Sequence, residues 1–211
     1  MPDGSGNGPM VRRFEPGDTD ALYDICIRTA DAGADARSQY RSPTLVGDIF
    51  AIPYTEREPE HAYVLDDGTG AAVGYILGTA DTEAFVRWYR REWIPRTASR
   101  RPVPPDPPVT QDDAMLALHH HPERMLVPQL AAYPAHLHID LLAEWQGSGW
   151  GRRLMTRFLA GLRAAGVPAV HLGMVAHNTG ARKFYDRLGF FEIDVPDTPN
   201  LIYLGRSTAQ D

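Results

Sequence analysis

The stretch EWQGSGWGRRL, residues 144–154, carries three glycines within five positions. It separates an apolar run at 136–143 from an amphipathic run at 150–166. Glycine weakens a helix or strand, so this density indicates a backbone that bends sharply or approaches a ligand closely. A glycine-rich turn that leads into a helix leaves backbone N–H groups without intrahelical partners, and such groups attract phosphate. The alternative is a tight strand–helix connection in which the glycines serve packing alone.

Charge at the turn is consistent with a phosphate site. Arg152 and Arg153 follow the glycines, in a chain whose formal net charge is -6. Side chains at Gly147, Gly149 or Gly151 would keep an anion away from the backbone. Two common phosphate loops do not match, because the Lys-Ser/Thr ending of a Walker A motif is missing and the G-x-G-x-G spacing differs from the dinucleotide fingerprint.

The periodicity around the turn predicts alternating strands and helices. In the last third we expect strands at 136–143, 168–175, 190–195 and 200–205, with helices at 150–165 and 178–188. This order predicts a βαβ unit with two parallel strands in the middle of a sheet. Before the turn we expect strands at 11–14, 61–67 and 71–81, and helices capped by Asp18, near 45–50, at 82–93 and at 112–121.

The composition limits the function classes. With 211 residues, 43% hydrophobic and 23% charged, the chain suits one soluble globular domain. The net charge argues against a general nucleic-acid partner, and no run reaches the roughly 20 apolar residues that span a bilayer. Cys26 is the single cysteine, and the first ten residues lack a signal-peptide pattern, so we expect a cytoplasmic protein. The three consecutive histidines at 119–121 point in different directions on a helix, so we expect no metal site.

The expected domain boundaries follow from the same composition. A disordered tail is expected at 1–10, a single domain at 11–206 and a short tail at 207–211. The segment 95–113 holds six prolines. Such a segment cannot continue a helix or a central strand, so it is expected to form a semi-rigid surface loop inserted in the domain.

Two motifs that follow one another along the chain resemble motifs of the GCN5-related N-acetyltransferase (GNAT) family. The family's Q/R-x-x-G-x-G/A signature is present as QGSGWG, residues 146–151. The stretch NTGARKFYDRLGFFE, residues 178–192, matches the family's later pattern of an Asn that opens a helix, a Tyr seven residues on and a Gly-Phe pair. The likeness covers roughly residues 11–205. A fainter likeness, through residues 134–154, is to the acetyltransferase-like domain at the C-terminus of O-GlcNAcases.

The resemblance implies an α/β (α+β) fold of the GNAT type. Its central sheet is mixed and mostly antiparallel, is splayed at a central parallel strand pair and is flanked by helices. It also implies acetyl-CoA as cofactor, with the pyrophosphate on the backbone of the glycine turn and the pantetheine arm along the end of the preceding strand. The implied cofactor-binding residues are Leu141, Leu142, Gln146, Gly147, Ser148, Gly149, Trp150, Gly151, Arg152, Asn178 and Tyr185.

Acetyl transfer to an amine requires an acid and a base. A thiolate, with a pKa of about 8.5 by analogy with cysteine, leaves more readily beside an acid. The resemblance places Tyr185 near the thioester sulfur, where its hydroxyl suits this role. The alternative is a core aromatic on an amphipathic helix. The amine, with a pKa of about 10, must lose a proton to a base, directly or through water.

The candidates for the base lie on strand 136–143. Strand alternation places His136, His138 and Asp140 on one face, and titratable groups in a cleft are functional candidates. The His-x-His pattern resembles that of arylalkylamine N-acetyltransferases, where such histidines relay the proton. His138 and Asp140 are both kept as the catalytic base. The alternative is a pair of structural histidines with Asp140 fixing a loop, and a bulge would reverse the alternation near Asp140.

These observations predict an acetyl-CoA-dependent N-acetyltransferase with a small-molecule amine acceptor. The segments 32–60 and 82–135 match nothing in the family core and are large enough to enclose a compact acceptor. A protein-lysine acetyltransferase with an open groove is an alternative within the same class. A catalytically inactive acetyl-CoA-binding or interaction module is the alternative from another class. The sequence is compatible with a monomer or a homodimer.

Overall fold

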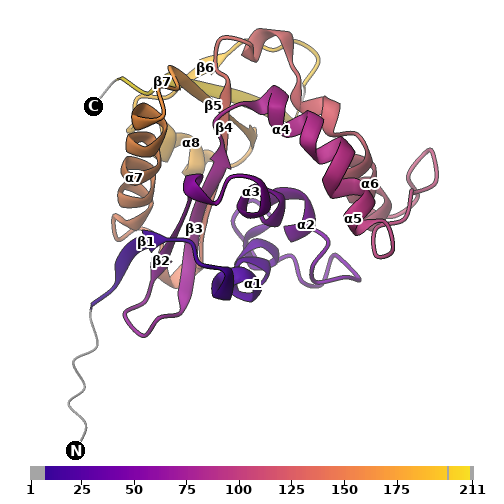
Figure 1. The fold of residues 1–211 in the computed structure, drawn as a ribbon, viewed down its shortest axis with the longest axis horizontal. Coiled ribbons are helices and arrows are strands. Elements are labelled where there is room, and N and C mark those ends of the chain that lie inside the picture. The colour runs from indigo at the N-terminus through magenta and orange to yellow at the C-terminus, as the bar shows by residue number, and fades with distance from the viewer. Residues whose placement is uncertain (1–7, 199, 210–211) are drawn as a thin grey trace, which may run out of the picture.

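A computed structural model describes residues 8–198 and 200–209. Within these residues seven strands form one sheet in the order β1-β2-β3-β4-β5-β7-β6 (Figure 1). Their bounds are β1 Met10–Arg13, β2 Ala62–Asp66, β3 Ala72–Thr79, β4 Ala135–Leu141, β5 Ala169–Val175, β6 Phe191–Ile193 and β7 Leu201–Ser207. Strands β4 and β5 run parallel and every other neighbouring pair runs antiparallel. The expected mixed sheet with a central parallel pair is confirmed.

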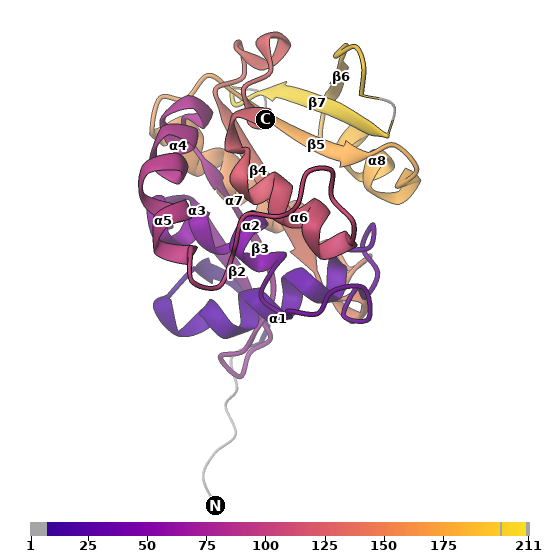
Figure 2. The same cartoon turned by 90° about the vertical axis from the view of Figure 1, so that its right-hand side faces the viewer.

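Helices cover both faces of this sheet. Their bounds are α1 Thr19–Thr29, α2 Gly47–Phe50, α3 Ile52–Arg57, α4 Thr82–Trp88, α5 Ile94–Thr97, α6 Gln111–His120, α7 Trp150–Ala164 and α8 Thr179–Asp186. α7 and α8 lie on one face, and Figure 2 shows α1, α2 and α6 in front of the other. The sheet is therefore the middle layer of three.

Strand alternation divides the buried side chains between the two faces. In β2, Ala62 and Val64 join the hydrophobic cluster of α1 to α3, whereas Tyr63 and Leu65 join that of α7 and α8. A central strand buried on both faces carries few polar residues. The polar residues at the end of β4 are an exception to this rule, and they mark the site described below.

Several expected element boundaries are wrong in informative ways. Asp18 does not cap α1, because its carboxylate accepts hydrogen bonds from the Arg12 guanidinium at 2.7 and 2.8 Å. The helix expected at 82–93 is divided into α4 and a π-helical segment, η3 (Tyr89–Trp93). β1 begins at Met10 and β7 ends at Ser207, so the sheet extends past both expected domain limits. Of the expected tails, residues 1–7 and 210–211 lie outside the described residues.

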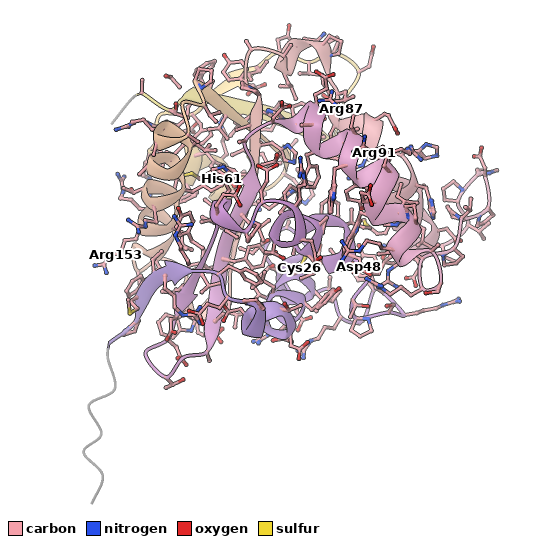
Figure 3. All side chains as sticks on the ribbon, in the orientation of Figure 1. Cys26, Asp48, His61, Arg87, Arg91 and Arg153 are labelled. Atoms are coloured by element: carbon pink, nitrogen blue, oxygen red, sulfur yellow. The ribbon has the colours of Figure 1, made fainter. Side chains whose placement is uncertain are left out.

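The proline-rich segment 95–113 is tied to the core at its start. Pro95 stands in the first turn of α5, where a proline is tolerated, so the prediction of an entirely non-helical segment is wrong there. Arg100 and Arg101 then donate, at 2.9 and 2.8 Å, to the carboxylate of Asp48, whose side chain is 0% exposed. Figure 3 labels Asp48. Beyond these anchors the segment lies on the surface, with Val103 exposed.

Candidate active site

A cavity of about 730 Å³ opens where β4 and β5 separate. The two strands pair only at Ala135–Val170 and His136–His171. Beyond these pairs both strands continue, and residues 137–141 of β4 and 172–175 of β5 line the cavity. Because the strands part, backbone groups on the facing edges are left open to a ligand. The splay that the resemblance implies is thus present.

The glycine turn forms one wall of this cavity and uses its glycines in two ways. Gly147 and Gly149 have φ of +71° and +85°, in the left-handed region, and a Cβ at either would meet nothing within 4 Å. The backbone at these two residues therefore faces open space. Gly151 differs, because a Cβ there would lie 3.1 Å from the Phe184 ring. The third glycine lets α7 pack closely on α8, so the packing interpretation holds at Gly151, whereas a ligand at Gly147 and Gly149 stays a prediction.

The turn carries a run of free backbone donors. Among the residues that the structure describes, no acceptor is bonded to the N–H groups of 147–152. The first bond of the helix runs from the Arg153 N–H to the Gly149 carbonyl, at 3.2 Å. These donors lie at the N-terminus of a 15-residue helix, where the dipole favours an anion. The turn can therefore hold a phosphate group.

The two arginines of the turn have different positions. Arg152 lines the cavity. Arg153 lies on the outer side of α7, where its guanidinium carbon stands 4.4 Å from the centre of the Trp150 ring (Figure 3). Such a cation–π contact stabilises the first turn of α7. Of the two arginines of the turn, Arg152 is thus the one that can meet an anion in the cavity, which Arg187 also lines.

Most of the expected cofactor-binding residues meet at this cavity, and three do not line it. Those that line it are Leu141, Gln146, Gly147, Gly149, Gly151, Arg152, Asn178 and Tyr185. Leu142 is buried in the cluster of α1 to α3, and its N–H donates to the Val73 carbonyl at 3.1 Å. Ser148 is exposed at the tip of the turn, and Trp150 contacts Arg153 as described above.

Gln146 and Asn178 use their side chains within the protein. The Gln146 amide donates to the Leu141 carbonyl at 2.9 Å, which fixes the turn to the end of β4. Asn178 Oδ1 accepts from the Ala181 N–H at 3.0 Å and caps α8, while Nδ2 donates to the Ala32 carbonyl at 3.0 Å. Asn178 therefore joins the loop after α1 to α8 at the cavity, and its expected bond to a cofactor stays a prediction.

Tyr185 brings an unbonded hydroxyl to the cavity. Its ring is 8% exposed and lies edge-on to Phe184 and Phe190. Within the described part of the chain, the hydroxyl has no hydrogen-bond partner. Burial, and then the charge of Asp140, raise the pKa of Tyr185, so the hydroxyl keeps its proton at neutral pH. It is a hydrogen-bond donor available to a ligand.

The polar residues of β4 occupy the face that strand alternation predicts. The register between β3 and β4 is regular from Gly74–Leu141 to Thr79–His136, so no bulge reverses it. His136 is 5% exposed and its two ring nitrogens lie 2.7 Å from the Tyr54 hydroxyl and 2.8 Å from Thr82 Oγ1. It has no free polar atom, which agrees with the structural interpretation for this histidine.

His138 and Asp140, the two candidate bases, both line the cavity. Burial, followed by the charge of Arg124, lowers the pKa of His138 to about 3. Burial also raises the pKa of Asp140, and the hydrogen bond from Tyr75 opposes that rise. A stronger base has a higher pKa, so the environment weakens His138 and strengthens Asp140. The electrostatics favour Asp140.

Sequence reasoning missed the residues that surround these two. Tyr54 and Tyr75 bond the polar face of β4, and four side chains from α2, α6 and neighbouring segments form an apolar wall of the cavity: Tyr40, Val46, Phe50 and Met115. Strand pairing could have placed Tyr75 beside Asp140, because the two are cross-strand partners. Nothing in the turn-rich stretch before β2 signals Tyr54.

Two further expectations concern a metal and a membrane. In residues 8–198 and 200–209, no group of three or more His, Cys, Asp and Glu side chains is placed to hold a metal ion. His119 instead lies 2.8 Å from the Tyr89 hydroxyl and 3.0 Å from Thr97 Oγ1. In the same residues, every helix is too short or too polar to cross a bilayer.

Comparison with known proteins gives three levels of likeness. The crystal structure of SsHAT is 58% identical, with a TM-score of 0.93, over 96% of this chain and 100% of that one. Protein O-GlcNAcase of Rattus norvegicus is 26% identical over 201 residues, which make up 93% of this chain and 22% of the relative. The chain thus spans about a fifth of the length of that curated relative. yncA from Salmonella typhimurium, solved with its cofactor acetyl-CoA, is 14% identical with a TM-score of 0.54 over 97% of this chain and 96% of that one, a likeness of fold alone.

A family model decides the classification. The model of the acetyltransferase (GNAT) family matches residues 22–190, well over half of the chain. The matched segment contains the parted strands, the glycine turn and Tyr185. The chain belongs to the acetyltransferase (GNAT) family, whose general reaction is acetyl transfer from acetyl-CoA.

Proposed function

We propose that this chain transfers an acetyl group from acetyl-CoA to the amine of a small-molecule acceptor. One observation carries the proposal: a single cavity is lined by the glycine turn, the free edges of β4 and β5, the Tyr185 side chain and Asp140. An anion site, an acid and a base therefore share one space. The free and buried thiol of Cys26 supports a reducing, cytoplasmic location.

The residues at the turn fit the cofactor of the family. The free N–H groups of 147–152 and the side chain of Arg152 would hold the pyrophosphate. The edge of β4 from Leu137 to Leu141 would pair with the amides of the pantetheine arm. Acetyl-CoA, when bound, supplies the thioester whose carbonyl carbon the amine attacks.

Asp140 and Tyr185 would move the protons of the reaction. The carboxylate of Asp140 takes a proton from the acceptor amine, because a protonated amine has no lone pair for attack. The Tyr185 hydroxyl gives a proton to the sulfur as the C–S bond breaks, and its phenolate takes up the second proton that the nitrogen loses as the amide forms. The raised pKa makes Asp140 a stronger base. For Tyr185 the raised pKa keeps the hydroxyl protonated at neutral pH and also makes it a weaker acid.

The cavity walls support a compact acceptor with an apolar part. Tyr40, Val46, Phe50 and Met115 offer an apolar surface, and Asp140 offers the negative charge that attracts an ammonium group. These wall residues come from the segments before β2 and before β4. A protein-lysine acceptor would need an open groove in their place.

A catalytically inactive acetyl-CoA-binding or interaction module is a second candidate. The observation that favours it is the relative named protein O-GlcNAcase, which matches 93% of the chain under a name that does not denote acetyl transfer. Under this candidate acetyl-CoA binds and no acceptor is acetylated.

Isothermal titration with acetyl-CoA, followed by an acceptor screen, tests the proposal. We expect a Kd in the micromolar range, about -8 kcal/mol, and loss of binding in a Gly149→Leu variant. A screen of small amines against lysine peptides should show turnover with the former. Binding without turnover would support the inactive module, and turnover confined to peptides would support the protein-lysine alternative. No binding would overturn the proposal.

A further inference from the structure

A continuous chain of hydrogen bonds links the polar face of β4 to the α4 end of the molecule. Thr82 Oγ1 lies 2.7 Å from the Pro134 carbonyl and 2.8 Å from His136 Nδ1. His136 Nε2 lies 2.7 Å from the Tyr54 hydroxyl, and the same hydroxyl lies 3.0 Å from His138 Nε2. Each hydroxyl in the chain has one proton and two partners, so the direction of every bond can be worked out.

The chain begins at an atom that can only accept. The Pro134 carbonyl has no proton, so Thr82 must donate its hydroxyl proton to it. Because Thr82 donates its only hydroxyl proton to Pro134, its oxygen can only accept from His136. Nδ1 of His136 must therefore carry hydrogen. The first bond thus fixes the tautomer of the first histidine.

The same count of protons and partners fixes the tautomer of His138. His136 is neutral, because burial and the charge of His171 lower its pKa, so Nε2 is bare and accepts the Tyr54 proton. The Tyr54 oxygen then accepts from His138, and Nε2 of His138 must carry hydrogen. His138 is also neutral, so its Nδ1 is bare.

That bare nitrogen belongs to a residue that lines the cavity, and it is accessible. His138 lines the cavity, and within the described residues its Nδ1 has no hydrogen-bond partner. In the same part of the chain, the one buried side-chain nitrogen or oxygen without a partner is Nδ1 of His61. The unpartnered Nδ1 of His138 is therefore reached by solvent. It lies on the same face of β4 as Asp140.

We propose that Thr82, His136 and Tyr54 are positioning residues that hold His138 as its Nε2–H tautomer, so that the Nδ1 lone pair accepts an N–H of the acceptor amine. Asp140 takes one proton from the amine, and His138 Nδ1 accepts a hydrogen bond from another and orients the nitrogen for attack. The part played toward the amine rests on the proposed function. The tautomer does not, since it follows from bonds within the protein.

Nitrogen NMR of the wild-type protein tests the tautomer directly. In a long-range ¹H–¹⁵N correlation spectrum of ¹⁵N-histidine-labelled protein at neutral pH, we expect His138 to show a protonated Nε2 and an unprotonated Nδ1. His136 should show the opposite pattern. A protonated Nδ1 on His138, or a charged ring, would overturn the inference without any variant being made.

Matched variants then test what holds the tautomer. Tyr54→Phe should give His138 a mixture of both tautomers and should lower kcat/KM for the acceptor about tenfold, the loss of one hydrogen bond. Tyr89→Phe is the control, since Tyr89 is equally buried and bonds the ring of His119 instead. Thr82→Val should disturb the His136 signals, and Thr82→Ser should restore them. An unchanged His138 pattern in folded Tyr54→Phe would overturn the role of Tyr54.

The NMR spectrum and the kinetics together distinguish a failure of this inference from a failure of the proposed function. If no acceptor is acetylated, the proposed function fails while the spectrum still decides the tautomer. If an acceptor is acetylated but Tyr54→Phe changes the spectrum and leaves kcat/KM unchanged, the tautomer is confirmed and the role of His138 toward the amine is overturned.

Discussion

The Tyr75 hydroxyl lies 2.7 Å from Oδ2 of Asp140, directly across the ladder between β3 and β4. Tyr75 is fully buried, whereas Asp140 lines the cavity. Burial raises the pKa of Asp140, and the hydrogen bond from Tyr75 favours the charged carboxylate and limits that rise. The hydrogen bond from Tyr75 therefore affects the pH at which Asp140 loses its proton.

Tyr75→Phe should shift the pH dependence of the reaction upward. A base acts only when unprotonated, so kcat/KM falls as the pH drops through the pKa of Asp140. Loss of the hydrogen bond raises that pKa, and a bond to a charged group corresponds to roughly one to two pH units. The measurement is a kcat/KM–pH profile. Tyr63→Phe, in the core on the opposite face of the sheet, is the control and should leave the acidic limb in place.

Asp140→Asn should lower kcat about 100-fold or more and spare acetyl-CoA binding. The amide has nearly the shape of the carboxylate and cannot take a proton, and general base catalysis typically contributes 10²–10⁴-fold. Steady-state kinetics measure the first effect and calorimetry the second. Undiminished turnover in this variant would assign the base to another group, with His138→Gln as the next variant to measure.

Tyr185→Phe should slow turnover about tenfold to 100-fold without weakening acetyl-CoA binding. The hydroxyl has no partner among the described residues, so its removal strands no other group. A phenylalanine keeps the ring contacts with Phe184 and Phe190. The measurement is kcat beside Kd, and equal kcat in both proteins would show that the leaving thiolate needs no proton from Tyr185.

Local periodicity and two short motifs were enough to predict the sheet and one wall of the site. Strands and helices at 135–193 follow from alternation and from apolar positions that recur at helical spacing, and the parting of β4 and β5 follows from the family resemblance. The Asp18 cap failed because Arg12, on the neighbouring strand, competes for the same carboxylate at 2.7 Å. The same carboxylate accepts from the Glu15 N–H at 2.8 Å, and the Asp18 backbone is itself helical, whereas a capping residue typically has an extended backbone.

The opposite wall and the segments packed behind it could not be predicted, because their contacts join residues far apart in sequence. Tyr54 meets His138 across 84 positions, and Arg101 meets Asp48 across 53. Neither pair is marked in the amino-acid sequence by periodicity or by a motif. Tyr54 stands in a turn-rich stretch and Arg101 in a proline-rich one, where composition predicts exposure and the structure shows burial.

Asp48→Ala should cost about 3–5 kcal/mol of the free energy of unfolding, because it leaves the buried Arg101 without its counter-charge. Denaturant unfolding measures the loss. Asp35→Ala removes an exposed ion pair with Arg37 and should leave stability almost unchanged, because solvent screens exposed pairs. Similar losses of stability in the two variants would contradict the claim that the buried ion pair stabilises the protein more than the exposed one.

The same ion pair predicts a pH dependence of stability. Although burial acts to raise the pKa of Asp48, hydrogen bonds from Arg100 and Tyr23 and the charge of Arg101 lower it overall. A carboxylate with a depressed folded pKa stabilises the protein above its unfolded pKa of about 3.9, and that stability is lost as the pH falls. Wild-type protein should therefore lose more stability than Asp48→Asn between about pH 5 and pH 2, and parallel acid titrations would contradict this.

Gly149 and Gly166 have similar backbone conformations, so leucine at each position distinguishes the effect of backbone strain on stability from the effect on acetyl-CoA binding. Gly149 has φ of +85° and Gly166, just past the end of α7, has φ of +74°. A Cβ at either would meet nothing within 4 Å. Substituting leucine at either position forces a side chain into the left-handed region, which costs about 1–2 kcal/mol. Gly149→Leu and Gly166→Leu should therefore lower the unfolding midpoint alike, while of the two only Gly149 lines the cavity.

Calorimetry should show acetyl-CoA binding lost in Gly149→Leu and kept in Gly166→Leu. Equal binding by the two variants would mean that the anion does not approach the turn at Gly149.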